Sequence, residues 1–463
     1  MSTIAERLAS NILSTEWDNL PPQAIHWAKI GIVDTIGVTL AGAGEDCTRA
    51  VLAMPGVAET SGPALIFGHD RRTSVLDAVL INGVASHALD FDDVNNYIGG
   101  HPSVPLVPAI FALSDMVAVS GRDALLAYIV GFETETRIGR VVNHFHYEKG
   151  WHPTATIGIF GTVATASFLL GLDQERTAIA LGLAASLASG VKANFGTMTK
   201  PLHVGHSLRN GIIAALLARE GFTANAGAFE HHHGFLEVFN GAGNYDIERG
   251  LVEWGSPWNV MSPGPNLKQY PCCGSTHGAI NAVLALREAH DISPEKLVGI
   301  TVMTTPRRLP HTDNPDPKTG LEAKFSMHYV VARALCDGAV RLADFEGTAH
   351  EDEVPRTLMP KIKTGIHPDM SDPKYDGYDA EVVITTADGR RLTHRSGGHV
   401  LRGPGYPMTE AEIFGKFHDC SSRVLPKGNV KQLFSMLCGL ENLDNIRAVS
   451  ALIDVGRPAA IAS

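Results

Sequence analysis

Cysteine is scarce in this chain of 463 residues, which has six, at positions 47, 272, 273, 336, 420 and 438. One pair is adjacent and none has the C-x-x-C spacing, so the sequence signals neither a disulfide framework nor a four-cysteine zinc site. The scattered cysteines also do not suggest the ligands of an iron–sulfur cluster. We therefore expect a reducing, cytoplasmic location and no metal or other cofactor.

Basic runs are also missing. The net charge is −11, and the 38 Lys and Arg residues are scattered without a basic arm. A polyanion such as nucleic acid would need a basic patch to bind, so we expect no nucleic-acid partner.

Long apolar runs are few. The first residues carry Glu6, Arg7 and Asp18 where a signal peptide needs a continuous apolar core. Residues 154–172 form an uncharged run of 19 positions, about the length that a bilayer requires. Its threonines and glycines and the His-Pro at its entrance favour a helix buried among other helices. We expect no membrane association.

The spacing of apolar residues divides the chain into two regions with different patterns. Residues 1–266 have helical spacing and many small residues, with Pro22 suited to a first helical turn. Further helices are predicted near residues 73–89, 104–119, 122–142, 153–171, 174–189 and 204–221. This part predicts a large all-helical domain.

Residues 267–407 have the pattern of a smaller α+β domain. Val298, Ile300 and Val302 alternate as on one face of a strand, and Asp388-Gly389 separates two strand-like runs as in a hairpin. The proline-rich stretch "SPGPNLKQYP" marks the junction before this domain. After residue 408 helices return, and we expect residues 408–463 to rejoin the helical domain. The predicted fold class is therefore mainly α.

Titratable side chains gather beside glycine and proline turns in six short stretches. A histidine at a helix end is usually a cap or a satisfied core group, so no single stretch decides the function. The function is therefore inferred from all six stretches together. The stretches are "HALDFDD" (87–93), "HPSVP" (101–105), "GWHPTATIGIFG" (150–161), "KPLHVGHSLRNG" (200–211), "KQYPCCGSTHG" (268–278) and "NPDPKTGLEAKFSMHYVVA" (314–332).

In their order and spacing these stretches resemble the MmgE/PrpD family over essentially the whole chain. The resemblance implies a large helical domain with a smaller α+β lid, usually as a homodimer. It also implies cofactor-independent chemistry on small di- or tricarboxylates, by dehydration, decarboxylation or epimerisation. The family's active site lies in the cleft between the two domains.

The family motifs carry over to six candidate catalytic residues. They are Asp90 of D-F-D-D, His101 of H-P-S, His152 of "GWHPT", Lys200 of "KPLH", Lys268 of "KQYP" and Tyr329 of "FSMHY".

The chemistry of the family suggests roles for these side chains. The two histidines would move protons, because the pKa of histidine lies near neutrality. Lys200 and Lys268 would bind substrate carboxylates and counter developing negative charge. Asp90 would orient a histidine and stay ionised beside the cations.

Two departures from the family pattern bear on the reaction. Val94 follows D-F-D-D where a threonine is usual in the dehydratases and decarboxylases. Cys272 and Cys273 stand where the decarboxylases have a pocket histidine, and the next histidine is His277. Cys273 could be an acid-base thiol or a small buried hydrophobe, and both remain open. Cys273 and His277 are further candidates for binding substrate.

The main functional prediction is a cofactor-independent hydro-lyase acting on a hydroxy-polycarboxylate such as a 2-methylcitrate-like acid. The alternatives are an epimerase or racemase, and a decarboxylase, for which the missing histidine is unfavourable. Two other classes compete. One is a metal hydrolase using histidines with Asp90, Asp92 and Asp93, although no short ligand motif is present. The other is a carboxylate-binding protein without catalysis.

Overall fold

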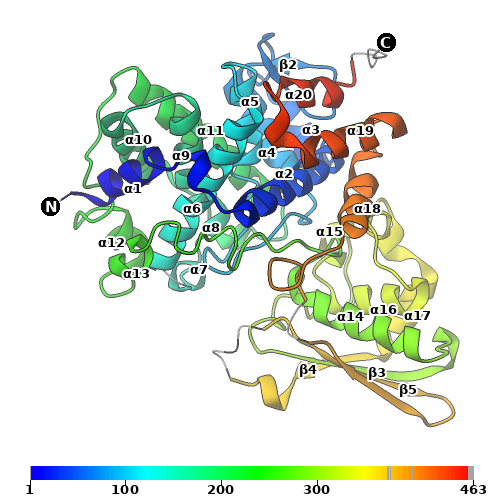
Figure 1. Ribbon diagram of the computed structural model, residues 1–463. Helices are drawn as coiled ribbons and strands as arrows, with labels where there is room; N and C mark the ends of the chain where they lie inside the picture. The colour runs from blue at the N-terminus through cyan, green and yellow to red at the C-terminus, as the bar shows by residue number, and fades with distance from the viewer. Residues whose placement is uncertain (1, 143, 373–374, 376, 398–399, 457–463) are drawn as a thin grey trace. The chain divides into compact units, whose positions relative to one another are not determined.

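The computed structural model describes residues 2–142, 144–372, 375, 377–397 and 400–456, and its chain forms two compact units (Figure 1). Unit 1 consists of Met1–Leu267 with Pro407–Ser463, and unit 2 of Lys268–Tyr406. The boundaries fall one residue from the predicted ones, at the proline-rich junction and before the returning helices. Each unit has its own apolar core.

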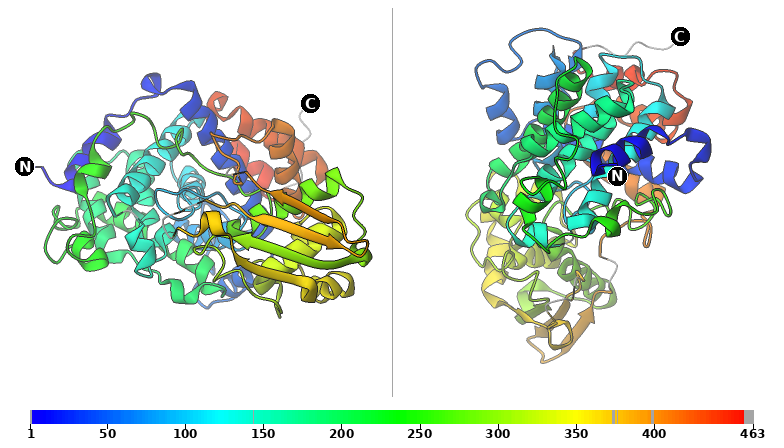
Figure 2. Two further views of the ribbon diagram at one scale, coloured as in Figure 1. Left: turned by 90° about the horizontal axis from the view of Figure 1, so that it is seen from below. Right: turned by 90° about the vertical axis from the view of Figure 1, so that its left-hand side faces the viewer.

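Unit 1 is built almost entirely from helices, which Figure 2 shows from two further sides. A two-residue antiparallel ladder, β1 (Ala64–Leu65) with β2 (Arg72–Thr73), corrects the prediction of an all-helical domain. The helices are α1 Ile4–Leu13, α2 Pro22–Gly42, α3 Asp46–Leu52, α4 Val75–His87, α5 Val107–Ser114, α6 Gly121–Val142, α7 Phe145–Glu148, α8 Pro153–Thr156, α9 Gly158–Leu169, α10 Gln174–Leu187, α11 Thr199–Arg219, α12 Phe235–Asn240, α13 Ile247–Leu251, α18 Glu410–Ser421, α19 Lys427–Cys438 and α20 Arg447–Ile453.

The C-terminal helices belong to unit 1. Thr409 caps α18, and its side chain and that of Glu412 form a reciprocal capping box. Helices α18 and α19 both pack against α2, so the tail closes the core that the first residues begin. By length and composition, α2 is apolar enough to span a membrane. Of the 18-residue stretch of α2 that meets this criterion, 83% is buried inside the structure.

Helix α11 begins earlier than its apolar spacing predicts, at Thr199 rather than near residue 204. Pro201 lies in the first turn, where proline is tolerated because its missing N–H would have no helical partner. The early start places Lys200 on the helix.

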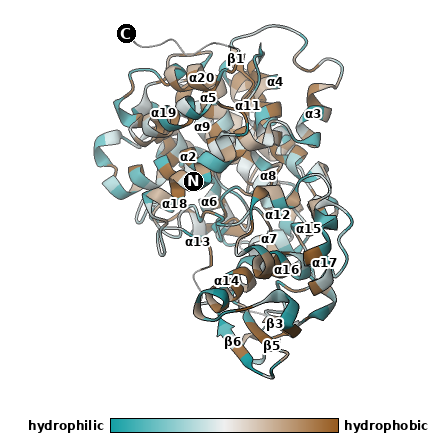
Figure 3. Ribbon diagram, turned by 90° about the vertical axis from the view of Figure 1, so that its right-hand side faces the viewer, coloured by the Kyte–Doolittle hydropathy of each residue, from teal (hydrophilic) through white to brown (hydrophobic). Residues whose placement is uncertain are grey.

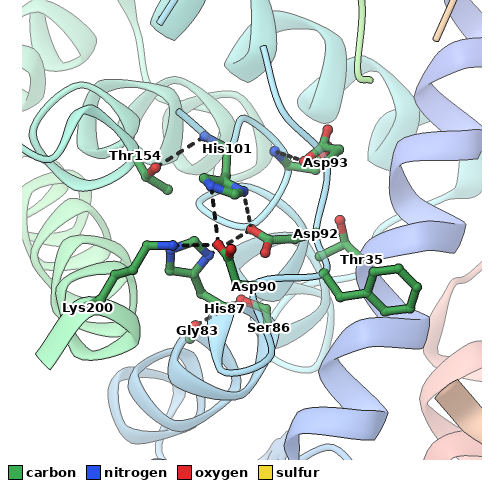
Figure 4. A network of polar contacts seen from close by, with 12 residues as sticks. Thr35, Gly83, Ser86, His87, Asp90, Asp92, Asp93, His101, Thr154 and Lys200 are labelled. Carbon is green, nitrogen blue, oxygen red and sulfur yellow. Dashed lines mark hydrogen bonds and ion pairs between the residues drawn. The ribbon is translucent and has the colours of Figure 1, made fainter. Parts of the chain in front are cut away.

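A close helix crossing positions the site. Helix α11 packs against α4, and a Cβ atom added at Gly83 would lie 2.8 Å from the Gly205 Cα. A Cβ at Gly205 would lie 2.3 Å from the Leu80 carbonyl oxygen. Only glycine permits these approaches. The crossing brings the C-terminal end of α4 and the N-terminal end of α11, with His87 and Lys200, into one region (Figure 4).

Unit 2 contains a four-stranded mixed sheet in the order β4-β3-β5-β6. Strands β3 and β4 are parallel, and the other neighbours are antiparallel. Helices α14 and α16 pack against the sheet. In Figure 3 its strands carry both hydrophobic segments, in brown, and hydrophilic segments, in teal. The bounds are β3 Leu297–Thr304, β4 Ile362–Ile366, β5 Glu381–Thr386, β6 Arg391–Arg395, α14 Gly274–Ala289, α15 Gly320–Ala323, α16 Met327–Asp337 and α17 Glu353–Leu358.

The strands confirm the predicted hairpin and correct one residue. Asp388 and Gly389 lie in the turn between β5 and β6, where Gly389 has φ +85°. Val298 does not share the buried face of Ile300 and Val302, since it is 59% exposed. The ladder between β3 and β5 shifts register between Leu297 and Gly299, which turns Leu297 inward instead.

Candidate active site

Four of the six predicted catalytic residues meet in unit 1. Asp90 lies just after α4, His101 lies in the following loop, His152 precedes α8, and Lys200 lies in the first turn of α11. All four are at most 9% exposed. Figure 4 shows the side chains of Asp90, His101 and Lys200 pointing toward one another.

Asp90 joins the cation to one of the histidines. The Lys200 Nζ donates a hydrogen bond to Asp90 Oδ1, and the His101 Nε2 lies 3.7 Å from the same oxygen. Asp90 has φ +53°, a left-handed conformation that aspartate tolerates better than most residues and that is often found at functional sites. The pair brings an ammonium and a carboxylate together where little water screens them.

Asp92 contacts two imidazoles and orients them, whereas the predicted orienting carboxylate was Asp90. Its Oδ2 lies 2.8 Å from the His87 Nδ1, with which it hydrogen-bonds, and 2.9 Å from the His101 Nδ1. The second approach lacks the angle of a hydrogen bond, so we treat it as an electrostatic contact. Burial alone would raise the pKa of Asp92, but His101 and His87 outweigh it and hold the pKa well below its usual value.

His87 also belongs to the site, although no role was predicted for it. Burial lowers its pKa to about 4, against the opposing effect of Asp92, so its ring is neutral near pH 7. The ring lies 4.6 Å from that of His101 and 5.5 Å from that of His152, between centroids. Its signal in the sequence is the first letter of "HALDFDD".

His152 is buried among other rings. Its Nδ1 lies 3.1 Å from the His203 Nδ1, and the Phe195 ring lies nearly perpendicular to it, with 4.9 Å between the ring centroids. Its Nε2 is buried and has no hydrogen-bond partner among the described residues. Burial, followed by the nearby His87 and Lys200, places the pKa of His152 well below its usual value. The ring is therefore neutral in the free protein.

A further carboxyl, that of Asp93, is buried beside these groups. Asp93 accepts hydrogen bonds from the Ser103 Oγ at 2.6 Å and the Ser103 amide at 3.2 Å, and the Ser103 Oγ is also 2.6 Å from the Tyr128 hydroxyl. Burial raises the pKa of Asp93 to about 8. These bonds tie the D-F-D-D turn to the H-P-S loop and fix His101 relative to Asp92.

The candidates in unit 2 lie near the N-terminal end of α14. Lys268 is 2% exposed, and the Cys273 amide donates to the Lys324 carbonyl at 3.0 Å. The His277 Nε2 lies 3.3 Å from the Cys272 carbonyl oxygen. Burial raises the pKa of the Cys272 thiol to about 12, so Cys272 is not a thiolate at neutral pH.

Tyr329 lies in the apolar core of unit 2. Its hydroxyl lies within hydrogen-bond distance of the Asp344 and Ala349 carbonyl oxygens, between which its one proton is shared, and it accepts from the Arg333 Nε at 2.9 Å. Burial raises its pKa to about 12, against the effect of Arg333. The structure thus gives this hydroxyl an anchoring position.

Among the residues that the structure describes, two groups of side chains have the spacing of metal ligands. One is the exposed His231, His232 and His233, and the other is the buried His87, Asp92 and His101. In the buried group Asp92 is already engaged by both imidazoles, and the Lys200 ammonium pairs with the adjacent Asp90. That arrangement disfavours a further cation, so the absence of a metal stays our prediction.

The fold and the site together define a two-domain enzyme with a buried set of acid-base groups beside a lysine. Family models match both parts of the chain, the MmgE/PrpD N-terminal domain over residues 6–248 and the MmgE/PrpD C-terminal domain over residues 270–438. This protein belongs to the MmgE/PrpD family, as the motifs indicated.

Its similarity to characterised relatives extends over nearly the full length. It is 29% identical to a cis-aconitate decarboxylase of Mus musculus, covering 98% of this chain and 94% of the relative. It is 28% identical to a cis-aconitate decarboxylase of Homo sapiens, covering 100% and 97%. It is 27% identical to one of Aspergillus terreus, covering 96% and 94%. These relatives favour the decarboxylase alternative over the dehydratase that we predicted first.

Proposed function

We propose that the protein is a cofactor-independent carboxy-lyase acting on a small unsaturated tricarboxylate such as cis-aconitate. The observation that carries this proposal is the near full-length similarity to cis-aconitate decarboxylases. The buried lysine, carboxylates and histidines of unit 1 suit such a reaction, because it needs a proton donor and a cation beside a carboxylate.

The reaction has a simple balance. In an acid whose carboxylate is one carbon removed from a C=C bond, the C–C bond to that carboxylate breaks and CO₂ leaves. The released electron pair forms a new C=C bond, and the pair of the old C=C bond takes a proton at its far carbon. Each turnover therefore consumes one proton, which a positioned acid must supply and which contributes about 10²- to 10⁴-fold in rate.

We assign the proton transfer to His152 and His101, without distinguishing them, and the binding of a substrate carboxylate to Lys200. At neutral pH the free site holds the Asp92 carboxylate and neutral rings at His87 and His152. A trianion arriving there raises the pKa of the nearby imidazoles, since negative charge favours their charged form. Substrate binding thus prepares the acid that the reaction uses.

Cys272 and Cys273 stand where the decarboxylases have a pocket histidine, which counted against decarboxylation on the motifs alone; the near full-length similarity to cis-aconitate decarboxylases outweighs that one departure. Lys268, Cys273 and His277 remain predicted substrate contacts. Tyr329 is left out of the acid-base set because its hydroxyl is engaged by the core of unit 2.

The test is incubation of the purified protein with cis-aconitate and with 2-methylcitrate, followed by proton NMR and CO₂ detection. The proposal expects CO₂ and a dicarboxylate with a terminal methylene group from cis-aconitate, with one solvent deuterium when the reaction runs in D₂O. Absorbance near 240 nm growing from the hydroxy acid would indicate the dehydratase instead. Solvent deuterium in recovered substrate without product would indicate the epimerase.

A further inference from the structure

A second histidine, His203 at the end of "KPLH", had no predicted role and contacts His152. His203 lies in the second turn of α11, and its Nδ1 lies 3.1 Å from the His152 Nδ1. His203 is half-buried, whereas His152 is 1% exposed. The contact therefore links a fully buried ring to a ring at the edge of the cluster.

The backbone holds both rings in place. The His152 amide donates to the Gly190 carbonyl at 3.0 Å, and a Cβ at Gly190 would lie 3.3 Å from the His203 Cγ. Gly190 has φ +127°, so a side chain here would be strained as well as crowded. The Ser207 Oγ donates to the Ala155 carbonyl at 3.0 Å, which ties α11 to α8 beside the two histidines.

A hydrogen bond between two neutral imidazoles carries one proton, and its position decides the tautomer of both. If His203 donates, the remaining proton of His152 lies on Nε2. If His152 donates from Nδ1, its Nε2 is an acceptor. Because Nε2 is buried and has no partner among the described residues, a proton there would be an orphaned donor, which proteins avoid more strictly than an orphaned acceptor.

We propose that His203 is a positioning residue that accepts a hydrogen bond from the His152 Nδ1–H and so leaves the His152 Nε2 as the atom that takes and gives the catalytic proton. The tautomer of His152 is inferred from its contact with His203. The reaction in which its Nε2 takes part is the one given under the proposed function, on which this part rests. In the reaction, Nε2 takes a proton when the anionic substrate binds and delivers it to the substrate carbon, while Nδ1–H stays bonded to His203.

The charged and titratable groups around the pair make the arrangement depend on pH. His87 and His101 face His152 from α4 and from the loop after it, and Lys200 and His203 face it from α11. His203 itself faces Lys200 and His206, and burial followed by these two groups lowers its pKa. When His203 becomes protonated at low pH it can no longer accept from His152, and the tautomer reverses.

The first measurement needs no substrate. In the full-length protein labelled with ¹⁵N-histidine, the His152 resonances, assigned with His152→Gln, should show a protonated Nδ1 and an unprotonated Nε2 near pH 7. His203→Phe, which keeps a ring but cannot accept, should shift them. His203→Gln, whose amide oxygen can accept, should restore them. His26→Asn, at an exposed histidine of α2, should leave them unchanged. A His152 proton found on Nε2 in the wild-type protein would overturn the proposal.

The second measurement is kinetic. His203→Phe should lower kcat about 10- to 100-fold, the usual effect of losing a partner that orients a functional histidine, with KM within about 3-fold of wild type. His203→Gln should recover most of kcat, and the control His26→Asn should retain it. Wild-type kcat in His203→Phe, with a cooperative melt, would refute the positioning role. Absence of any turnover in the wild-type protein would instead count against the proposed function, and the NMR arm would still decide the tautomer.

Discussion

The candidate residues of the two units differ in how they are engaged. In unit 1, Asp90, His101 and Lys200 contact one another, and His152 keeps an unpartnered ring nitrogen among the described residues. In unit 2, the Tyr329 hydroxyl is engaged by carbonyls and an arginine, and His277 lies at a carbonyl of its own turn. This difference shows that a residue can match a family motif and still have a structural role, as the hydrogen bonds of Tyr329 within unit 2 indicate. Proton transfer is expected to depend on unit 1.

The largest expected effect is at His152. His152→Gln removes the proposed acid and should lower kcat by about 10²- to 10⁴-fold and remove one limb of the pH profile. The matched control is His146→Gln, at another buried histidine of unit 1 whose ring nitrogens bond Asn240 and Thr156. The control should melt at a lower temperature while keeping the shape of the pH profile. An unchanged pH profile in His152→Gln would remove His152 from the mechanism.

The next effect compares the lysines of the two units. Lys200→Ala and Lys268→Ala should each lower kcat/KM by about 2 to 5 kcal/mol in transition-state binding, because each removes a cation proposed to hold a substrate carboxylate. Steady-state kinetics measures both. Lys149→Ala, an exposed lysine of unit 1, should have no effect. Full activity in Lys268→Ala alone would confine carboxylate binding to unit 1.

Asp93 offers a test through stability. With its pKa raised to about 8 by burial, the folded protein keeps a proton that the unfolded chain loses above about pH 4. This group therefore lowers the free energy of unfolding by about 1.4 kcal/mol per pH unit between those values, as pH rises. Asp93→Asn does not titrate, so its stability relative to wild type should increase from pH 5 to pH 8 in denaturant melts.

The control for this measurement is Asp419→Asn at an exposed aspartate, for which the difference from wild type should stay flat. A flat difference for Asp93→Asn as well would mean that Asp93 is ionised in the folded protein.

A smaller effect on activity is expected at Tyr329. Tyr329→Phe removes a hydroxyl that bonds two carbonyls and Arg333, which should cost about 1 to 3 kcal/mol of stability because buried partners are left unsatisfied. Its kcat/KM should stay within about 3-fold of wild type at a temperature well below the melt. A large loss of kcat without loss of stability would restore the catalytic role that the family motif suggests.

No effect is expected from metal removal. Prolonged chelation should leave turnover unchanged, because lysine and imidazolium groups can stabilise the developing charge without a Lewis acid. Elemental analysis before and after chelation accompanies the assay. Activity that falls on chelation and returns with added metal would displace the acid-base mechanism in favour of a metal-dependent one, with His87, Asp92 and His101 as the buried candidate ligands.

Much of the architecture was predictable because it depends on local rules. The capping box of Thr409 and Glu412, the turn at Asp388-Gly389 and the proline-rich junction each act within a few residues. The face of Val298 was predicted wrongly, because a bulge against β5 is a property of the paired strand. The early start of α11 was missed because apolar spacing does not register a polar first turn.

The sequence by itself determined the family, the two-unit division and the presence of a lysine, carboxylates and histidines in motifs with a known chemistry. Tertiary structure decided which of them act on one another. Asp92, rather than Asp90, contacts two imidazoles, and His203 reaches His152, because glycine-permitted approaches bring α4, α8 and α11 together. Contact and burial, which set the proton affinity of each group, arise between residues far apart in the chain. Local sequence patterns therefore cannot predict these contacts or the burial of each group.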